Sequence, residues 1–165
     1  MAGTAAEQAY ETIVPRLDPP MLIVTACWDD ERSGCLVGFH AQSSIHPLRH
    51  TVMLSKANHT WKVAGEASHL VVHFCDERDV GLARLFGSQT GDEVDKFAQV
   101  EWHDSPAGVP VLGHCLTWLE GRILTRHDDG DHVAHLLEWT AGSTEGELRP
   151  LRLSAVGDLE PGHPA

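Results

Sequence analysis

The sequence has little positive charge and no long apolar run, and both absences narrow the choice of function. It carries 12 Lys and Arg residues against 24 Asp and Glu residues, a formal net charge of −12 at pH 7. Because an acidic surface repels phosphate backbones, nucleic acid is not expected as a partner. No run approaches the roughly 18 apolar residues that a membrane helix needs, and residues 1–8 lack the basic and apolar regions of a secretory signal. We therefore expect a cytoplasmic protein with no membrane or nucleic-acid partner.

Motifs of several other classes are also missing. The four cysteines form no C-x-x-C pair, and no G-x-S-x-G hydrolase motif is present. Scattered cysteines in a cytosolic chain are usually buried small apolar residues rather than disulfide partners. The pairs His46/His50 and His132/His135 have spacings that a metal site uses, but neither has a nearby Cys or carboxylate in a known ligand pattern. We therefore expect no metal site.

What the chain contains is typical of one β-rich domain, and 165 residues are enough to bury a core. β-branched apolar runs predict strands, and short amphipathic segments predict helices. The predicted strands are 21–28, 35–39, 51–54, 69–75, 114–125 and 131–139, and the predicted helices are 5–14, 61–67, 78–86 and 92–100. Because regular βαβ alternation is absent, we predict a mainly β fold, a small antiparallel barrel with peripheral short helices.

The other segments are predicted to be irregular. Turns are expected at 29–34 and 126–130, and loops at 40–50, 87–91 and 102–113. We divide the chain into an N-terminal helix and lead-in (1–16), the barrel domain (17–142) and a segment rich in Gly, Glu and Pro (143–165). That last segment is expected to be a loose tail or an arm on a partner subunit.

Two polar segments are candidate sites. The segment SKANHT, Ser55 to Thr60, joins a predicted strand to a predicted helix, where unpaired backbone N–H groups and the helix dipole favour an anion. Hydroxyl, amide and ammonium groups in this segment suit a phosphate, and the alternative is a capped surface helix without a ligand. The second segment is the loop 40–50, in which Gln42, Ser43 and Ser44 supply hydrogen-bonding groups beside a strand end. Its alternative is an ordinary connector.

Six pieces of the sequence, taken in order, resemble the flavin reductase-like, FMN-binding split-barrel family over about residues 17–141. The pieces are MLIVTACW, GFHAQSSIHP, TVMLSKANHT, LARLFGSQTGDEVDKF, GVPVLGHCLTWLEGRI and GDHVAHLLEW. The resemblance implies a small antiparallel split β-barrel of the Greek-key type. Two departures concern the loop 40–50: His46-Pro47-Leu48 stands where the family often has Asp-Pro-Pro, and His40 stands where it often has Thr or Ser. They leave the flavin ring contacts and the flavin type open.

The resemblance also implies roles for individual residues. By this resemblance, the flavin phosphate would be held by Ser55, Lys56, Asn58 and Thr60. The edge of the isoalloxazine ring would be lined by Gln42, Ser43 and Ser44. Lys96 and Phe97 would lie near the cofactor pocket, and His132 would lie by the nicotinamide or substrate face. His132 is the one residue to which a catalytic role is given, orienting the nicotinamide or stabilising the reduced flavin. A surface hairpin histidine is the alternative.

The function that the resemblance implies is an NAD(P)H:flavin reductase. It would pass hydride from NADH or NADPH to FMN, or to FAD, and could feed reduced flavin to a flavin-dependent monooxygenase. Two alternatives stay open: a split-barrel protein that binds FMN, haem or a deazaflavin without nicotinamide turnover, and a non-enzymatic dimeric binding module. The family is usually homodimeric, and apolar residues at outward strand positions, Trp118, Leu136 and Trp139, also favour a homodimer.

Overall fold

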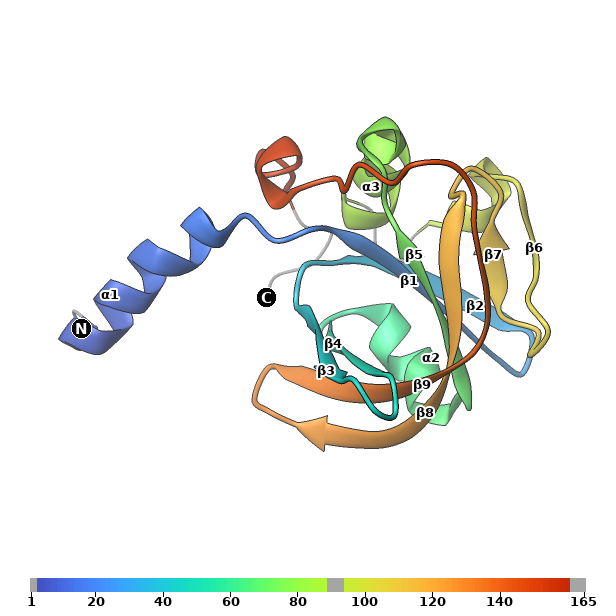
Figure 1. Cartoon of the computed structure of the whole chain (residues 1–165), viewed down its shortest axis with the longest axis horizontal. Coiled ribbons are helices and arrows are strands. Elements are labelled where there is room, and N and C mark those ends of the chain that lie inside the picture. Colours follow the sequence, from blue (N-terminus) through green and yellow to red (C-terminus); the bar gives the residue numbers. More distant parts are fainter. Residues whose placement is uncertain (1–2, 89–93, 161–165) are drawn as a thin grey trace.

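The computed structural model describes residues 3–88 and 94–160, and its centre is one antiparallel sheet (Figure 1). The seven strands of this sheet are β1 (Leu22–Trp28), β2 (Glu31–Val37), β3 (His40–Ser44), β4 (Arg49–Ser55), β5 (His69–Phe74), β8 (Thr117–Asp128) and β9 (His132–Thr144). They lie in the order β2-β1-β5-β8-β9-β4-β3, and every neighbouring pair is antiparallel. The predicted mainly β, antiparallel fold is confirmed.

The sheet is an open barrel, because no ladder joins its edge strands β2 and β3. Helix α2 (His59–Glu66) packs against β1 and β2 near one edge and against β4 near the other, so it lies across the open side. Its residues Val63 and Ala64 belong to the same buried cluster as Val24, Val52 and Leu137 from three strands of the sheet. The first core is therefore shared by the sheet and α2.

A second core lies on the opposite face of β1. There Ile23 packs with Phe86 of α3 (Val80–Ser88), with Phe97 of the 3-10 turn η3 (Lys96–Gln99) and with Leu151 from the C-terminal segment. The 3-10 turn η2 (Glu77–Asp79) precedes α3, and η4 (Leu153–Ala155) follows Leu151. Residues distant in the sequence thus cover one side of the barrel.

The ribbon formed by β6 (Trp102–Asp104) and β7 (Pro110–Leu112) is fastened to the sheet by His73. The Leu112 N–H donates to His73 Nε2 at 2.9 Å, so Nδ1 carries the proton and donates to the Ile23 carbonyl at 3.0 Å. Burial lowers the pKa of this fully buried imidazole to about 4. A neutral histidine therefore connects β1, β5 and β7.

The turn between β1 and β2 is shorter than the predicted 29–34. Asp29 and Asp30 have positive φ angles of 49° and 62°, and β2 begins directly afterwards at Glu31. Two consecutive left-handed residues form a tight hairpin turn whose twist matches that of the strands, and Asp tolerates this conformation. Cys27 lies opposite Arg32 in this register, and all four cysteines are free thiols.

The loops predicted at 40–50 and 102–113 contain strands, which is a correction. Strand β3 lies at the edge of the sheet and pairs with β4. Because its register shifts between Gln42 and Ser44, its sequence does not show the alternation of polar and apolar residues that predicts a strand. Strands β6 and β7 have three residues each, too few to show periodicity. Of the helix predicted at 92–100, the described part forms only η3, while 92–93 and most of the loop 87–91 lie outside the described residues.

The C-terminal segment is part of the domain, which corrects the expectation of a loose tail for residues 148–159. Leu151 and Val156 are buried, and Leu151 exchanges backbone hydrogen bonds with Met21 and Cys75 at 2.7–2.8 Å. The Asp76 carboxylate also accepts from the Arg149 N–H at 2.9 Å. Composition alone suggested a polar tail, but these few apolar residues and backbone groups bind it to β1 and β5.

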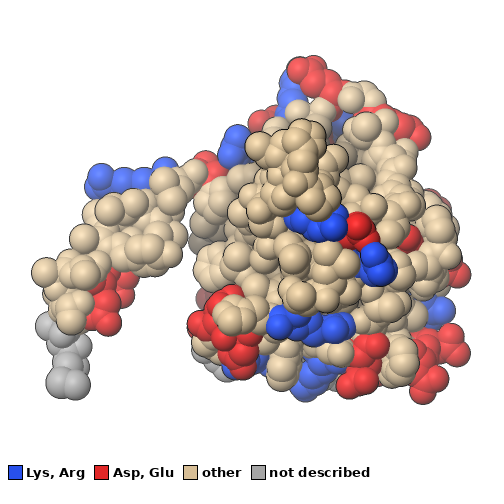
Figure 2. Space-filling view, turned by 60° about the horizontal axis from the view of Figure 1, so that its bottom comes forward, with Lys and Arg blue, Asp and Glu red and all other residues tan. Residues whose placement is uncertain are grey.

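Two of the residues expected to mark a dimer surface serve the chain's own packing. Trp118 packs on the buried cluster of Val71, Val109 and Val111, and Trp139 packs on the first core. Both side chains are half-buried, and the dimer surface expected at Trp118, Leu136 and Trp139 stays a prediction. Among the described residues, no helix is both long and apolar enough to cross a membrane. Figure 2 shows acidic and basic side chains interspersed on the face drawn there.

Candidate functional site

A cleft of about 270 Å³ opens where the end of β2, the junction of β4 and α2, and the start of β9 meet. Its walls are largely apolar, with a few polar side chains on one side. The lining residues used below are Met21, Val37, Phe39, Met53, Leu54, Ser55, Asn58, Gly87, His132 and Leu153. An apolar cleft with few convergent polar groups is the usual form of a cofactor site.

The polar side of the cleft is built by the turn from β4 into α2. The Asn58 N–H donates to the Ser55 carbonyl at 2.9 Å, and the Ser55 hydroxyl accepts from the Ala57 N–H at 3.3 Å. Asn58 Oδ1 accepts from the Thr60 N–H at 3.0 Å and caps α2. Since Oδ1 is engaged, the Asn58 amide Nδ2 is the group with which this residue can donate to a ligand in the cleft.

His132 faces the same cleft from β9, directly across the ladder from Ser55. Its Nδ1 lies 2.6 Å from Asp131 Oδ1, and its ring packs against Phe39 with centroids 4.9 Å apart. The hydrogen bond from His132 lowers the pKa of Asp131. The His132 ring is therefore held by the Asp131 carboxylate at one edge and by the Phe39 ring on its face. Three predicted site residues, Ser55, Asn58 and His132, line the same cleft.

Lys56 and Thr60, predicted for the phosphate, point elsewhere. Lys56 Nζ lies 2.8 Å from both carboxylate oxygens of Asp128 in the β8–β9 hairpin. The Thr60 side chain is fully buried, and its hydroxyl shares a 2.8 Å hydrogen bond with that of Ser33. In this arrangement the Thr60 hydroxyl does not reach the cleft, while Lys56 lies near it on the surface with its charge paired.

Gln42, Ser43 and Ser44 also lie away from the cleft, on the edge strand β3. Ser43 accepts a hydrogen bond from the Thr51 hydroxyl at 3.0 Å, and Gln42 donates to the Ser44 carbonyl at 3.4 Å. At about 3.3 Å per strand residue, Ser43 is about 13 Å along the chain from Phe39 at the cleft. The isoalloxazine role given to these residues stays a prediction.

Lys96 and Phe97 are buried between the second core and a separate cleft beside Trp102. Lys96 Nζ donates to the carbonyl oxygens of Gly34 and Phe86, at 3.0 and 3.1 Å. Burial lowers the pKa of this ammonium. The structure thus gives Lys96 two backbone partners and does not bring it together with Ser55 and His132, so its cofactor role also stays a prediction.

Sequence reasoning did not single out several cleft residues. Phe39 and Met53 are apolar residues that a sequence pattern assigns to strands without showing which face they occupy. Leu153, Val156 and Leu159 come from the segment expected to be loose. The signal that could have identified this segment is the spacing of Leu151, Leu153 and Val156 within a polar stretch.

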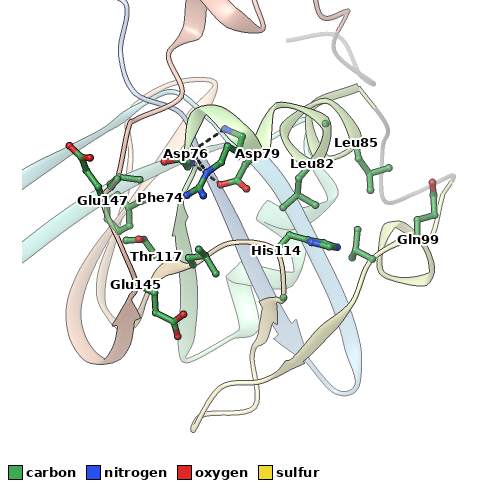
Figure 3. A pocket seen from close by; sticks show the side chains of 16 residues that line it. Phe74, Asp76, Asp79, Leu82, Leu85, Gln99, His114, Thr117, Glu145 and Glu147 are labelled. Atoms are coloured by element: carbon green, nitrogen blue, oxygen red, sulfur yellow. Dashed lines mark hydrogen bonds and ion pairs between the residues drawn. The ribbon is translucent and has the colours of Figure 1, made fainter.

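A second cleft, of about 580 Å³, is acidic (Figure 3). Asp76, Asp79, Glu145 and Glu147 line it. The guanidinium of Arg78, 2.8 Å from Asp76, holds the pKa of that carboxyl far below its usual range. Because the excess of carboxylates repels a phosphate, this cleft is the poorer candidate for a phosphate-bearing cofactor.

The histidine pairs do not converge. His132 lines the cleft, whereas His135 is fully buried, with Nδ1 bonded to the Val133 carbonyl at 2.9 Å. Burial lowers the pKa of His135 to about 4. Across residues 3–88 and 94–160 no group of three His, Cys, Asp or Glu side chains is placed to hold a metal ion.

An open antiparallel barrel with α2 across its gap, and an apolar cleft bordered by a strand-to-helix turn, agrees with the split-barrel fold that the resemblance implies. Comparison with known families specifies the class further. The chain belongs to the family of the flavin reductase like domain, whose model matches residues 14–155. It is thus an oxidoreductase of the flavin reductase type.

Individual relatives agree with this assignment. The chain is 27% identical over 146 residues to the reductase subunit HsaB of a flavin-dependent monooxygenase from Rhodococcus jostii, covering 86% of this chain and 71% of that protein. An FMN-binding protein from Thermus thermophilus superposes with a TM-score of 0.72 at 23% identity, over 77% of this chain and 71% of that one. The flavin reductase HpaC, solved with NADP⁺, superposes with a TM-score of 0.76 at 20% identity, over 88% and 92%. At these identities the two structures are similar in fold.

Proposed function

We propose that this flavin reductase binds the isoalloxazine ring of FMN in the cleft between β2, β4 and β9, and reduces it with NADH or NADPH. The observation that carries the proposal is the meeting of Ser55, Asn58 and His132 around one apolar cleft in a chain of this family. A relative that binds FMN and one solved with NADP⁺ support the choice of cofactors.

The residues present fit a flavin. A cleft of 270 Å³ is smaller than the roughly 300–1,000 Å³ of pockets that enclose a whole ligand, so it suits the flat ring with the ribityl phosphate along the surface. Met53, Leu54 and Val37 offer apolar contact to the ring. The turn from Ser55 to Asn58, at the start of α2, offers a hydroxyl, an amide and the positive end of the helix dipole to the phosphate.

The reaction needs little chemistry from the protein, because the bound flavin itself accepts the hydride. The chain's part is to align two rings and to exclude water. Phe39 and the C-terminal residues Leu153 and Val156 wall the cleft from solvent. His132, held at Nδ1 by Asp131, presents its other nitrogen for orienting the nicotinamide or for stabilising negative charge on the reduced ring.

Two partners belong to the proposal. Because relatives are reductase subunits or components of flavin-dependent monooxygenases, reduced flavin would pass to a monooxygenase. We also propose a homodimer, with the flavin cleft near its interface and the cytoplasm as its compartment. Whether FMN or FAD is preferred is decided by the same assays that test the activity.

The proposal is tested by steady-state oxidation of NADH and NADPH with FMN, FAD or riboflavin as acceptor. We expect turnover with at least one nicotinamide and a lower KM for FMN than for riboflavin, because only FMN carries the phosphate. His132→Gln should lower kcat or raise the nicotinamide KM, and His103→Gln, an exposed histidine on β6 outside the cleft, is the matched control. Tight FMN binding without nicotinamide oxidation would contradict the reductase and favour a flavin-binding protein without turnover.

A further inference from the structure

The N-terminal helix α1 (Ala5–Ile13) stands away from the rest of the chain (Figure 1; Figure 2). None of its residues is buried, and it continues directly into the 3-10 turn η1 (Val14–Leu17). Tyr10, Ile13 and Leu17 are between 55% and 69% exposed. At spacings of three and four residues they form one apolar stripe, so α1 presents an amphipathic face that no residue within 3–88 and 94–160 buries.

The helix is nonetheless well specified. Thr4 and Glu7 form a capping box, in which Thr4 Oγ1 accepts from the Glu7 N–H at 3.3 Å and Glu7 Oε2 accepts from the Thr4 N–H at 2.6 Å. A nine-residue helix is marginal in water by itself, because most helical stability in proteins comes from packing of the apolar face. A capped helix with an exposed stripe therefore indicates packing against another molecule.

The residue that follows α1 and η1 is anchored to the C-terminal segment. Asp18 follows η1 in the left-handed conformation, and its two carboxylate oxygens accept from the Ser154 N–H at 2.7 Å and the Ser154 hydroxyl at 2.8 Å. Ser154 lies in the C-terminal segment that walls the flavin cleft through Leu153 and Val156. The C-terminal end of α1 therefore leads into a segment anchored beside the cleft, and the helix extends away from the barrel from there (Figure 1).

The same chain carries exposed apolar residues beside the edge strand β3. Phe39, Ile45 and Leu48, between 54% and 65% exposed, flank the edge strand β3 at its two ends. The stripe from Tyr10 to Leu17 is about 10–12 Å long, and the five residues of β3 span about 16 Å. The outer edge of β3 has no neighbouring strand in the sheet.

We propose that α1 and η1 of one copy of this chain pack along β3 of a second copy, and that the contact is reciprocal. The proposal rests on the homodimer included in the proposed function and identifies the surfaces that form it. From their exposed fractions and side-chain areas of roughly 150–250 Å², the six side chains expose roughly 700 Å². Two reciprocal copies would bury roughly 1,400 Å², within the range of about 1,200–2,000 Å² for stable interfaces.

The charges beside the two surfaces are complementary. Glu7 and Glu11 flank the stripe of α1 on one side. Next to Leu48, Arg49 and Arg122 share the single carboxylate of Glu138, with Arg49 at 3.1 Å from it, and leave one positive charge in excess. A contact that pairs these groups offsets part of the repulsion between two chains of net charge −12.

The contact also reaches the flavin site, because Phe39 belongs both to this apolar surface and to the lining of the cleft. A helix that packs on Phe39 covers the mouth of the partner's cleft and holds the ring of Phe39 against His132. Each site is then completed by the other copy. Loss of the contact should therefore weaken flavin binding as well as association.

The test is sedimentation velocity on the full chain and on two matched double variants. Tyr10→Ser with Ile13→Ser removes the stripe, and Gln8→Ser with Thr12→Ser places two serines on the opposite face. We expect wild type and the control to be dimers, and the stripe variant to dissociate at least 100-fold more readily and to bind FMN more weakly. A stripe variant that stays as dimeric as the control would overturn the inference and leave the homodimer itself standing.

Crosslinking locates the contact. The variants Ile13→Cys and Leu48→Cys are mixed and treated with a short bismaleimide, and each variant alone is the background for the native cysteines. A covalent pair that forms above background only in the mixture supports packing of α1 on β3, and its absence contradicts it. A monomeric wild type would refute both the homodimer and this inference, while reductase turnover, measured separately, would leave the flavin reductase proposal untouched.

Discussion

Substitutions of Asn58 can distinguish its structural role from its proposed binding role, because its amide oxygen caps the helix while its amide nitrogen is the proposed donor to the ligand. Oδ1 caps α2 by accepting from the Thr60 N–H at 3.0 Å, and the rest of the amide lines the cleft beside Ser55. Asn58→Asp keeps an oxygen acceptor at the N-cap, where a carboxylate also suits the helix dipole. The same substitution places a negative charge where we propose that the flavin phosphate lies. It should therefore spare the fold and damage binding.

The magnitudes differ enough to be measured. Asn58→Ala removes the cap, so the free energy of unfolding should fall by about 1 kcal/mol. The same substitution removes a hydrogen bond to the charged phosphate, worth about 1.5–3 kcal/mol. The Kd of FMN should therefore rise roughly 10–150-fold. Asn58→Asp should leave the free energy of unfolding within about 0.5 kcal/mol of wild type. Repulsion of a nearby phosphate, about 2 kcal/mol or more after solvent screening, should raise the Kd of FMN at least about 30-fold.

The assay is a fluorescence titration with FMN and with riboflavin, beside urea unfolding of each variant. Riboflavin lacks the phosphate, so its Kd should change little in Asn58→Asp. If Asn58→Asp binds FMN as tightly as wild type, the phosphate does not lie at this turn. If FMN and riboflavin weaken equally, the substitution has damaged the ring site instead, and the reasoning from the helix start is refuted.

Three further predictions follow from single side chains. Lys96→Met removes the donor to two buried carbonyls, so the free energy of unfolding measured in urea should fall by about 2–4 kcal/mol. Weaker FMN binding in a variant of unchanged stability would contradict this and favour a cofactor role. His73 has a folded pKa of about 4, below the unfolded value of about 6.5, so wild-type stability should fall as pH drops from 6.5 to 4, by about 1.4 kcal/mol per unit from this residue. His73→Phe should be less stable than wild type at pH 8 but lose less stability over that pH range; an equal slope in urea unfolding at pH 8, 6 and 5 would contradict this. Asp131→Asn should shift the pH profile of kcat/KM if Asp131 orients His132, and an unchanged profile would show that the 2.6 Å contact has no part in turnover.

Much of the fold could be predicted because its central strands carry strong local patterns. The β-branched runs of β1 and β5 and the long strands around the Asp129-Gly130 turn are visible in the sequence. Strands β3, β6 and β7 are not, because they are short or lie at an edge where polar residues face solvent. The C-terminal segment was also missed, since its order depends on contacts with Met21 and Cys75 that are distant in the sequence.

Part of the candidate site lies where local structure decides the position of a side chain, and the flavin contacts themselves stay predictions. The sequence placed Ser55 and Asn58 at a strand-to-helix turn, and the structure brings both side chains to the cleft, with Asn58 capping α2. The hydroxyl of Thr60 suggested a phosphate contact, and the family resemblance implied a place near the cofactor pocket for Lys96. In the structure the Thr60 hydroxyl bonds to that of Ser33, and the Lys96 ammonium donates to two backbone carbonyls. Sequence shows which groups are available, and the direction of a side chain depends on packing that only the folded chain defines.

The central claim, that the chain passes hydride from a nicotinamide to a flavin in this cleft, is tested most directly by anaerobic single-turnover reduction. Protein loaded with FMN is mixed with NADH or with NADPH, and the flavin absorbance band is followed with time. The account predicts that the band bleaches much faster than that of free FMN and that Asn58→Asp, mixed at the same concentrations, loses most of this enhancement. Bound FMN that stays oxidised with both nicotinamides would contradict it.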